Sequence, residues 1–140
     1  MIFWDTSALV RCYSPLEVGH ERAKNFLLSE KGNKASALIE PELTSAIVRR
    51  LGRDKRNRES LLAEIKQHLE YFDLVNVGDD QIAKANALVR TYFLKALDAL
   101  HLASALSLSR ELGQKRMVFL TGDADQASAA RAERFKVIEL

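Results

Sequence analysis

The chain has 140 residues, of which 47% are hydrophobic and 29% are charged, and its formal net charge is only +2 at pH 7. This composition is typical of one soluble globular domain and excludes a disordered chain. The apolar runs are far shorter than the roughly 20 residues of a membrane span, and Asp5 comes too early for a signal peptide, so we expect a cytoplasmic protein with no membrane partner.

The N-terminal segment predicts a buried strand that leads into a helix. Met1 to Trp4 is short, apolar and aromatic, and Thr6 or Ser7 can cap a following helix. Asp5 lies between the two elements. A helix cap explains this carboxylate about as well as a functional role does, but its abrupt position after an apolar run favours a function.

Cys12 is the single cysteine of the chain, so it cannot form an internal disulfide. This agrees with a reducing compartment. A nucleophilic thiol would need a local partner, and the neighbouring sequence offers none. We therefore interpret Cys12 as a small packing residue.

The next segments predict two helices on either side of a short strand. Ser14-Pro15 ends the helix that follows Asp5. Apolar residues then recur at helical spacing from Glu17 to Ser29, which predicts the first of these two helices. Lys34 to Leu38 is a plausible strand. Pro41 fits the first turn of a helix that continues to Leu51.

Glu42 lies near the start of that predicted helix, where the helix dipole favours a negative charge. Taken alone, the residue is explained by this dipole. Glu40 is its rival as a functional acid, but it precedes Pro41 and is expected to point elsewhere.

The rest of the chain alternates helices and strands. Glu59 to Tyr71 predicts a helix that pairs antiparallel with the previous one. The later elements are expected as a strand over Phe72 to Val77, helices from Asp79 or Asp80 to about Phe93 and from Leu97 to Leu112, and strands over Met117 to Leu120 and Lys136 to Ile138. This alternation predicts a parallel, doubly wound α/β sheet.

Asp98 is the acidic residue that is hardest to explain structurally, because apolar residues surround it along its predicted helix. A charge in such a helix needs a partner. That partner is either a structural cation, such as Lys95 or Arg90, or a functional one. His101 lies one turn later, and we interpret it as a hydrogen-bonded core histidine, since carboxylate sites for hard metals rarely use imidazole.

Two acids follow the strand expected over Met117 to Leu120. Asp123 and Asp125 are separated by one residue on a strand-to-helix turn, so both can face the same side. A capped turn is the alternative explanation. A metal site is favoured because Asp123 lies at a position that is expected to converge with those of Asp5, Glu42 and Asp98.

Asp5, Glu42, Asp98 and Asp123 all lie at strand ends or helix starts. In an open parallel sheet these positions gather along one edge, where such folds place their ligands. Four carboxylates at close range would repel one another and raise some of their pKa values. A bound divalent cation would relieve this repulsion.

Three segments carry a resemblance to a known family. They are Phe3-Trp4-Asp5-Thr6-Ser7-Ala8-Leu9-Val10, the helix segment Asp98-Ala-Leu-His-Leu-Ala-Ser-Ala105, and Phe119-Leu-Thr-Gly-Asp123. Together they resemble the PIN domain, and within it the VapC-type toxins of bacterial type II toxin-antitoxin systems. The resemblance covers nearly all of the chain. It implies a single domain over residues 1–140 with a three-layer α/β/α fold around a parallel sheet of about five strands.

The resemblance also implies roles for individual residues. Asp5, Glu42, Asp98 and Asp123 match the four acidic positions of the family, Thr6 and Thr121 match its supporting hydroxyls, and Asp125 would be an auxiliary acid. The implied activity is that of an endoribonuclease that uses Mg²⁺ or Mn²⁺. Asp5, Asp98 and Asp123 would coordinate the metal directly or through water, and Glu42 would orient the water or a second ion.

The resemblance further implies three partners: an RNA substrate, a cognate VapB-like antitoxin that occupies the active-site groove, and a second copy of the chain. An antitoxin helix is expected to dock on an apolar groove between the helices over residues 40–51 and 59–71. One departure stands out. Family members often carry Asp-x-x-Phe after the last acid, where this chain has Asp125-Gln126-Ala127. That difference is expected to affect packing more than metal binding.

Basic residues are dense between Arg49 and Arg58 and could meet phosphates, although solvated helix ends often have this composition. Arg11, Arg49 and Arg50 are the candidate RNA contacts. Two other functions stay open: a non-catalytic RNA- or protein-binding module, and a phosphotransferase with Asp5 as its nucleophile. The second lacks an acid two residues after Asp5.

Overall fold

The computed structural model describes residues 1–113 and 116–140. Its centre is a five-stranded sheet in the order β3-β2-β1-β4-β5, and every neighbouring pair is parallel. The strands are β1 (Ile2–Trp4), β2 (Asn33–Ser36), β3 (Phe72–Val75), β4 (Val118–Thr121) and β5 (Lys136–Glu139). This confirms the parallel α/β sheet that the alternation of elements predicts.

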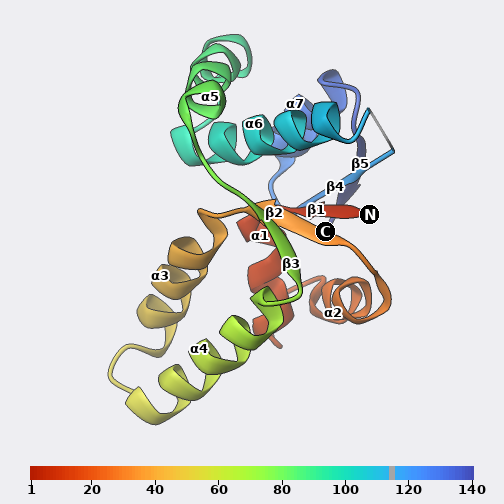
Figure 1. Ribbon diagram of the computed structural model, residues 1–140. Helices are drawn as coiled ribbons and strands as arrows, with labels where there is room; N and C mark the ends of the chain where they lie inside the picture. The colour runs from red at the N-terminus through yellow and green to blue at the C-terminus, as the bar shows by residue number, and fades with distance from the viewer. Residues whose placement is uncertain (114–115) are drawn as a thin grey trace.

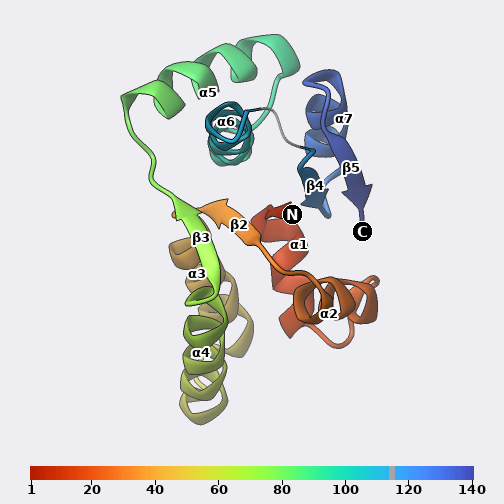
Figure 2. The same ribbon diagram turned by 45° about the vertical axis from the view of Figure 1, so that its right-hand side comes forward.

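Helices cover both faces of the sheet (Figures 1 and 2). On one face lie α1 (Thr6–Leu9), the 3₁₀ helix η1 (Val10–Tyr13), α2 (His20–Ser29), α3 (Ile39–Leu51) and α4 (Lys55–Leu69). On the other lie α5 (Asp79–Tyr92), α6 (Ala96–Glu111) and α7 (Ala124–Ala132). The result is the three-layer α/β/α fold that the resemblance implies.

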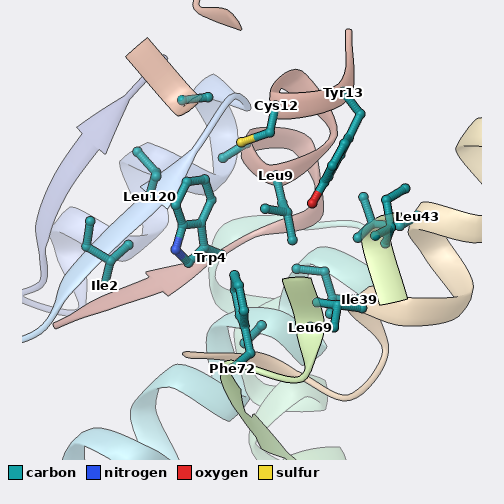
Figure 3. Close-up of a cluster of buried hydrophobic side chains, with 14 of the residues drawn as sticks. Ile2, Trp4, Leu9, Cys12, Tyr13, Ile39, Leu43, Leu69, Phe72 and Leu120 are labelled. Atoms are coloured by element: carbon teal, nitrogen blue, oxygen red, sulfur yellow. The ribbon is translucent and has the colours of Figure 1, made fainter. Parts of the chain in front are cut away.

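The central strand β1 supplies both layers of the core because its side chains alternate between the two faces. Ile2 and Trp4 pack with α1, α3 and α4 in the first hydrophobic cluster, where Trp4 meets Phe72 at a ring-centroid distance of 6.3 Å (Figure 3). Phe3 belongs to the second cluster and stacks on Phe119 at 5.8 Å. Cys12 is buried in the first cluster, which confirms its expected packing role.

Several element boundaries differ from the expected ones. The helix expected from Glu17 begins at His20, because Gly19 adopts a left-handed conformation with φ 87° just before it. The helix expected from Glu59 begins at Lys55, where the Asp54 side chain accepts a hydrogen bond from the Asn57 N–H and caps it. Part of the basic stretch is therefore helical.

Among the described residues, no helix is both long and apolar enough to cross a membrane.

The order in which strands are added to the sheet reverses beside β1. From β1 the chain adds β2 and then β3 on one side, and it later returns to place β4 and β5 on the other. The carboxyl ends of β1 and β4 therefore lie at the topological switch point, where open α/β sheets bind ligands. The Asp5 N–H donates to the Leu120 carbonyl at 2.9 Å and ties these two strand ends together.

Candidate active site

Asp5 follows β1 directly, and its side chain is almost fully buried. Its Oδ2 accepts the Ser7 N–H at 3.1 Å as the N-cap of α1, and it also accepts the Ser7 hydroxyl. Thr121 Oγ1 lies 3.2 Å from the same oxygen. Asp5 therefore caps α1, which is the structural explanation weighed above for this carboxylate. The other oxygen, Oδ1, makes no hydrogen bond with a described residue, so it is free for a ligand.

Asp123 occupies the equivalent position after β4. Its Oδ1 accepts the Gln126 N–H at 2.8 Å and caps α7, and its own N–H donates to Thr121 Oγ1 at 3.1 Å. The Ser7 hydroxyl accepts the Gly122 N–H at 2.8 Å. Thr121 and Ser7 thus connect the loop after β1 to the loop after β4. The Thr121 hydroxyl was expected from the resemblance as a supporting group, and the Ser7 hydroxyl is an additional one.

Gln126 is a site residue that the sequence reasoning missed. Its side chain is fully buried, and its Nε2 donates to the Asp98 carbonyl oxygen at 3.0 Å. Its Oε1 lies 3.0 Å from Thr121 Oγ1, whose single proton is donated to Gln126, to Asp5 or to the Ser7 hydroxyl. Gln126 thereby links the β4 loop to the first turn of α6. The only signal in the sequence was its place in the departure from the family's Asp-x-x-Phe pattern.

Asp98 lies in the first turn of α6 and is half-buried. Burial, together with the nearby charges of Asp5 and Asp123, raises the pKa of its carboxyl to about 6. No ion pair joins it to Lys95 or Arg90 among the described residues, and none of them donates a hydrogen bond to its carboxylate. The charge of Lys95 lowers the pKa of Asp98, but burial and the charges of Asp5 and Asp123 outweigh it. The structural-cation explanation thus has no direct contact behind it among these residues.

Glu42 joins this group through His101. The Oε1 atom of Glu42 lies 3.0 Å from His101 Nε2, which is also 3.2 Å from Thr6 Oγ1. His101 is fully buried, which confirms the interpretation as a hydrogen-bonded core histidine. Its Nδ1 is buried without a hydrogen-bond partner among the described residues.

The Glu42–His101 contact changes the pKa of both groups. Burial pushes the pKa of Glu42 upward, but the hydrogen bond and charge of His101 outweigh burial, so the pKa lies below its ordinary value. Burial pushes the pKa of His101 downward, but the Glu42 hydrogen bond and the charges of Asp5, Glu42 and Asp98 outweigh it, so the net shift is upward. All three carboxylates are thus close enough to His101 to act on it.

We use the term acidic edge for Asp5, Glu42, Asp98 and Asp123. In the part of the chain that the structure describes, no three His, Cys, Asp or Glu side chains stand close enough to hold a metal ion unaided. Mg²⁺ nevertheless suits this donor set, because it keeps several waters and needs only one or two carboxylates as direct ligands. The unpartnered, charge-repelled carboxylate of Asp98 fits such an ion.

The other candidate residues have different surroundings. Arg11 donates from Nη1 to the Val18 carbonyl at 2.8 Å and from Nη2 to the Gly122 carbonyl at 3.3 Å, so its guanidinium braces the loop before Asp123. Arg50 donates from Nη1 to the Tyr13 carbonyl at 3.2 Å and to the Ser14 hydroxyl. Arg49 and Asp125 are exposed. RNA contact by these arginines and an auxiliary role for Asp125 stay predictions.

Comparisons with solved structures show the same fold elsewhere. VapC20 of Mycobacterium tuberculosis, a toxin that cleaves the sarcin-ricin loop, is 22% identical, with a TM-score of 0.68 over 92% of this chain and 95% of that one. A chain of a toxin-antitoxin complex from Klebsiella pneumoniae is 23% identical, with a TM-score of 0.67 over 100% of both chains.

A comparison with curated protein sequences found no significant match. The family profile described as PIN domain, in contrast, matches residues 2–132. That span includes β1, β4 and all four carboxylates of the acidic edge. The chain therefore belongs to the PIN domain family.

Proposed function

We propose that the protein is an endoribonuclease dependent on Mg²⁺ or Mn²⁺ and that it is the toxin of a type II toxin-antitoxin module. The observation that carries the proposal is the state of Asp98. Its carboxylate forms no ion pair or hydrogen bond with another described residue, and its pKa is raised to about 6 by burial and by the charges of Asp5 and Asp123. Membership of the PIN domain family and the fold shared with VapC20 agree with this activity.

Asp5, Asp98 and Asp123 would hold the cation, directly or through water. When bound, such an ion lowers the pKa of water and stabilises negative charge on a phosphodiester. The chain contributes positioning. Ser7 and Thr121 fix one oxygen of Asp5, so its other oxygen has a defined direction. Gln126 performs a similar task for the first turn of α6 by holding the Asp98 carbonyl.

Glu42 is assigned to orienting water, or a second ion, beside the phosphate. Its contact with His101 keeps the carboxylate ionised, because the pKa of Glu42 is below its ordinary value. A carboxylate that stays ionised at neutral pH can accept a hydrogen bond from water and so orient it. His101 is therefore a positioning residue in this scheme, while Glu42 faces the reacting groups.

The proposed partners are RNA, a VapB-like antitoxin and a second copy of the chain. A toxin of this kind requires an inhibitor, and one structural neighbour belongs to a toxin-antitoxin complex. We propose that an antitoxin helix docks against α3 and α4, as the resemblance implies. Size-exclusion chromatography with light scattering tests the homodimer, and a monomeric mass would contradict it.

The test compares the wild-type protein with Asp98→Asn on total cellular RNA, with Mg²⁺, with Mn²⁺ and with EDTA. Cleavage by the wild type that EDTA abolishes and that the variant lacks would support the proposal. Absence of cleavage, together with equal harmlessness of wild type and variant on expression, would refute it. Calorimetric absence of Mn²⁺ binding would favour the alternative, a non-catalytic RNA- or protein-binding module.

A further inference from the structure

A second charged region lies where strands of the sheet begin, at the opposite end of the strands from the acidic edge. A cavity of about 620 Å³ opens where β4 and β5 begin, and Val118 and Lys136, the first residues of these strands, both line it. The C-terminal half of α6 and the segment after α7 form its other walls. We use the term basic cavity for this site, after the five cationic residues of the described chain that line it, Lys84, Arg110, Arg116, Arg134 and Lys136.

The basic cavity has little internal compensation. Its one acidic residue, Glu133, accepts the Tyr92 hydroxyl at 3.0 Å. None of the five cations forms an ion pair or a side-chain hydrogen bond with another described residue. Several like charges around one hollow create a positive potential that attracts anions.

Helix electrostatics explain only some of these charges. Arg110 in the last turn of α6 and Arg134 just after α7 would complement the negative ends of those helices. Lys84 lies in the first half of α5, and Lys136 begins β5. Cations from α5, α6, β5 and the segments before β4 and after α7 thus converge on one cavity without a shared structural reason.

The backbone at Arg134 gives a second, independent observation. The residue has φ 70°, in the left-handed region that favours glycine. It ends α7 in a Schellman arrangement, in which the Arg134 N–H donates to the Arg131 carbonyl at 2.9 Å and the Phe135 N–H to the Ala130 carbonyl at 3.0 Å. A long cationic side chain thus occupies the turn position best suited to glycine, and it lines the cavity. Backbone strain of this kind is typical of functional positions.

We propose that the basic cavity is a phosphate-binding site for a ligand with two or more linked phosphates. Guanidinium groups bind phosphate oxygens in pairs and ammonium groups bind them as point charges, which suits a site with three arginines and two lysines. Leu106, Met117 and Phe135 add an apolar wall suited to a base or a ribose. The phosphates come either from an RNA strand or from a free polyphosphate.

The site is separate from the acidic edge. Asp98 and Arg110 lie near opposite ends of α6, and twelve residues of α-helix extend about 18 Å. One small ligand cannot reach both. The phosphate site also needs no divalent cation, so it stands or fails independently of the proposed ribonuclease activity.

The test measures two binding reactions in EDTA: that of a short labelled polyuridine RNA by fluorescence anisotropy, and that of sodium tripolyphosphate by calorimetric titration. The variant combines Arg134→Gly and Lys136→Gln. Glycine suits the backbone at position 134, so loss of binding would not reflect misfolding. The matched control, Lys24→Gln with Lys66→Gln, removes the same charge from exposed positions of α2 and α4.

We expect the cavity variant to bind at least about tenfold more weakly than the control, with a salt dependence shallower by about 0.7 per lost phosphate contact on RNA. Weaker RNA binding alone identifies a strand as the source of the phosphates, and weaker calorimetric binding of tripolyphosphate alone identifies a small polyphosphate. Binding of both probes within about twofold of the control overturns the proposal.

Discussion

The two ends of α6 carry charges of opposite sign that are held in different ways. Near its N-terminus, the acidic edge is embedded in a network in which Ser7, Thr121 and Gln126 fix the loops around Asp5 and Asp123. Near its C-terminus, the basic cavity has cations on long side chains without ion-pair partners among the described residues. Neighbouring backbone and hydroxyl groups fix the first set, whereas the second keeps its rotamer freedom.

This difference shows how one helix can serve two kinds of ligand. A small hard cation demands oxygen ligands in a narrow geometry, so a rigid network favours it. Phosphates along a flexible ligand have no single geometry, so mobile cations suit them better. The predictions below test this contrast between a preorganised site and an adaptable one.

Asp98→Asn should have the largest effect. It removes the unpartnered carboxylate of the acidic edge while keeping its shape, and we expect ribonuclease activity to fall about a hundredfold or more, since a metal contributes several kcal/mol to such a reaction. Cleavage of labelled RNA in Mg²⁺ checks this. Asp80→Asn, which neutralises an exposed acid in the first turn of α5, is the matched control. Equal activity of both variants would contradict a role for Asp98.

Cation binding should weaken as the pH falls below about 6, because protons then compete for Asp98, whose pKa is raised to about 6 by burial and by Asp5 and Asp123. The expected loss of Mn²⁺ affinity is up to about tenfold per pH unit. Calorimetric titration at several pH values checks this, and Asp98→Asn should flatten the dependence. A pH-independent affinity in the wild type would contradict it.

The same shift makes a prediction about metal-free stability. The folded pKa of Asp98 exceeds its unfolded value of 3.8, so its contribution is full below pH 3.8 and is lost as the pH rises through about 6. At pH 7.5, Asp98→Asn should therefore be more stable than the wild type, by about 1 kcal/mol once solvent screening of this half-exposed group is included. Urea unfolding in EDTA at pH 4 and 7.5 measures the difference, which should shrink at the lower pH.

Gln126→Leu tests whether the network positions the acidic edge. The change leaves the Asp98 carbonyl without its donor and should lower the free energy of unfolding by about 1–3 kcal/mol. Mn²⁺ affinity should fall with it. Gln67→Leu, at an exposed position of α4, provides the control. Lower stability with unchanged Mn²⁺ affinity would mean that Gln126 is only structural.

Arg134→Gly should have the smallest effect, and unlike Gln126→Leu it should raise the free energy of unfolding. Relief of the left-handed conformation at φ 70° should raise the free energy of unfolding by up to about 1 kcal/mol. Thermal unfolding of the single variant measures it. A destabilised variant would mean that the Arg134 side chain, and not its backbone strain, dominates the stability of this turn.

The sequence predicts the acidic edge better than the basic cavity, for a physical reason. Asp5 and Asp123 each end an apolar strand, and strands of a parallel sheet bring their carboxyl ends together, so the sequence alone signals convergence. The strands and most helices were likewise predicted from alternation and periodicity, with shifted boundaries where Gly19 and the Asp54 cap decide the helix start.

The basic cavity gives no such signal. Its cations come from α5, α6, the approach to β4, the turn after α7 and β5, so only the tertiary structure brings them together. In the sequence they are less conspicuous than the dense run from Arg49 to Arg58, where Arg50 instead bonds to Tyr13 and Ser14. Gln126 was missed for a similar reason, since the two partners of its side chain, Thr121 and Asp98, lie on β4 and α6.

The packing of Trp4 offers an optical probe of the acidic edge. It is the only tryptophan of the chain and immediately precedes Asp5. Its ring is fully buried, and its Nε1–H donates to Asn33 Oδ1 at 2.9 Å across the β1–β2 pair. The emission of the native protein therefore reports on the strand that carries Asp5, without any introduced label. Unfolding will move that emission to longer wavelength, and the same signal can follow ligands that act on the end of β1.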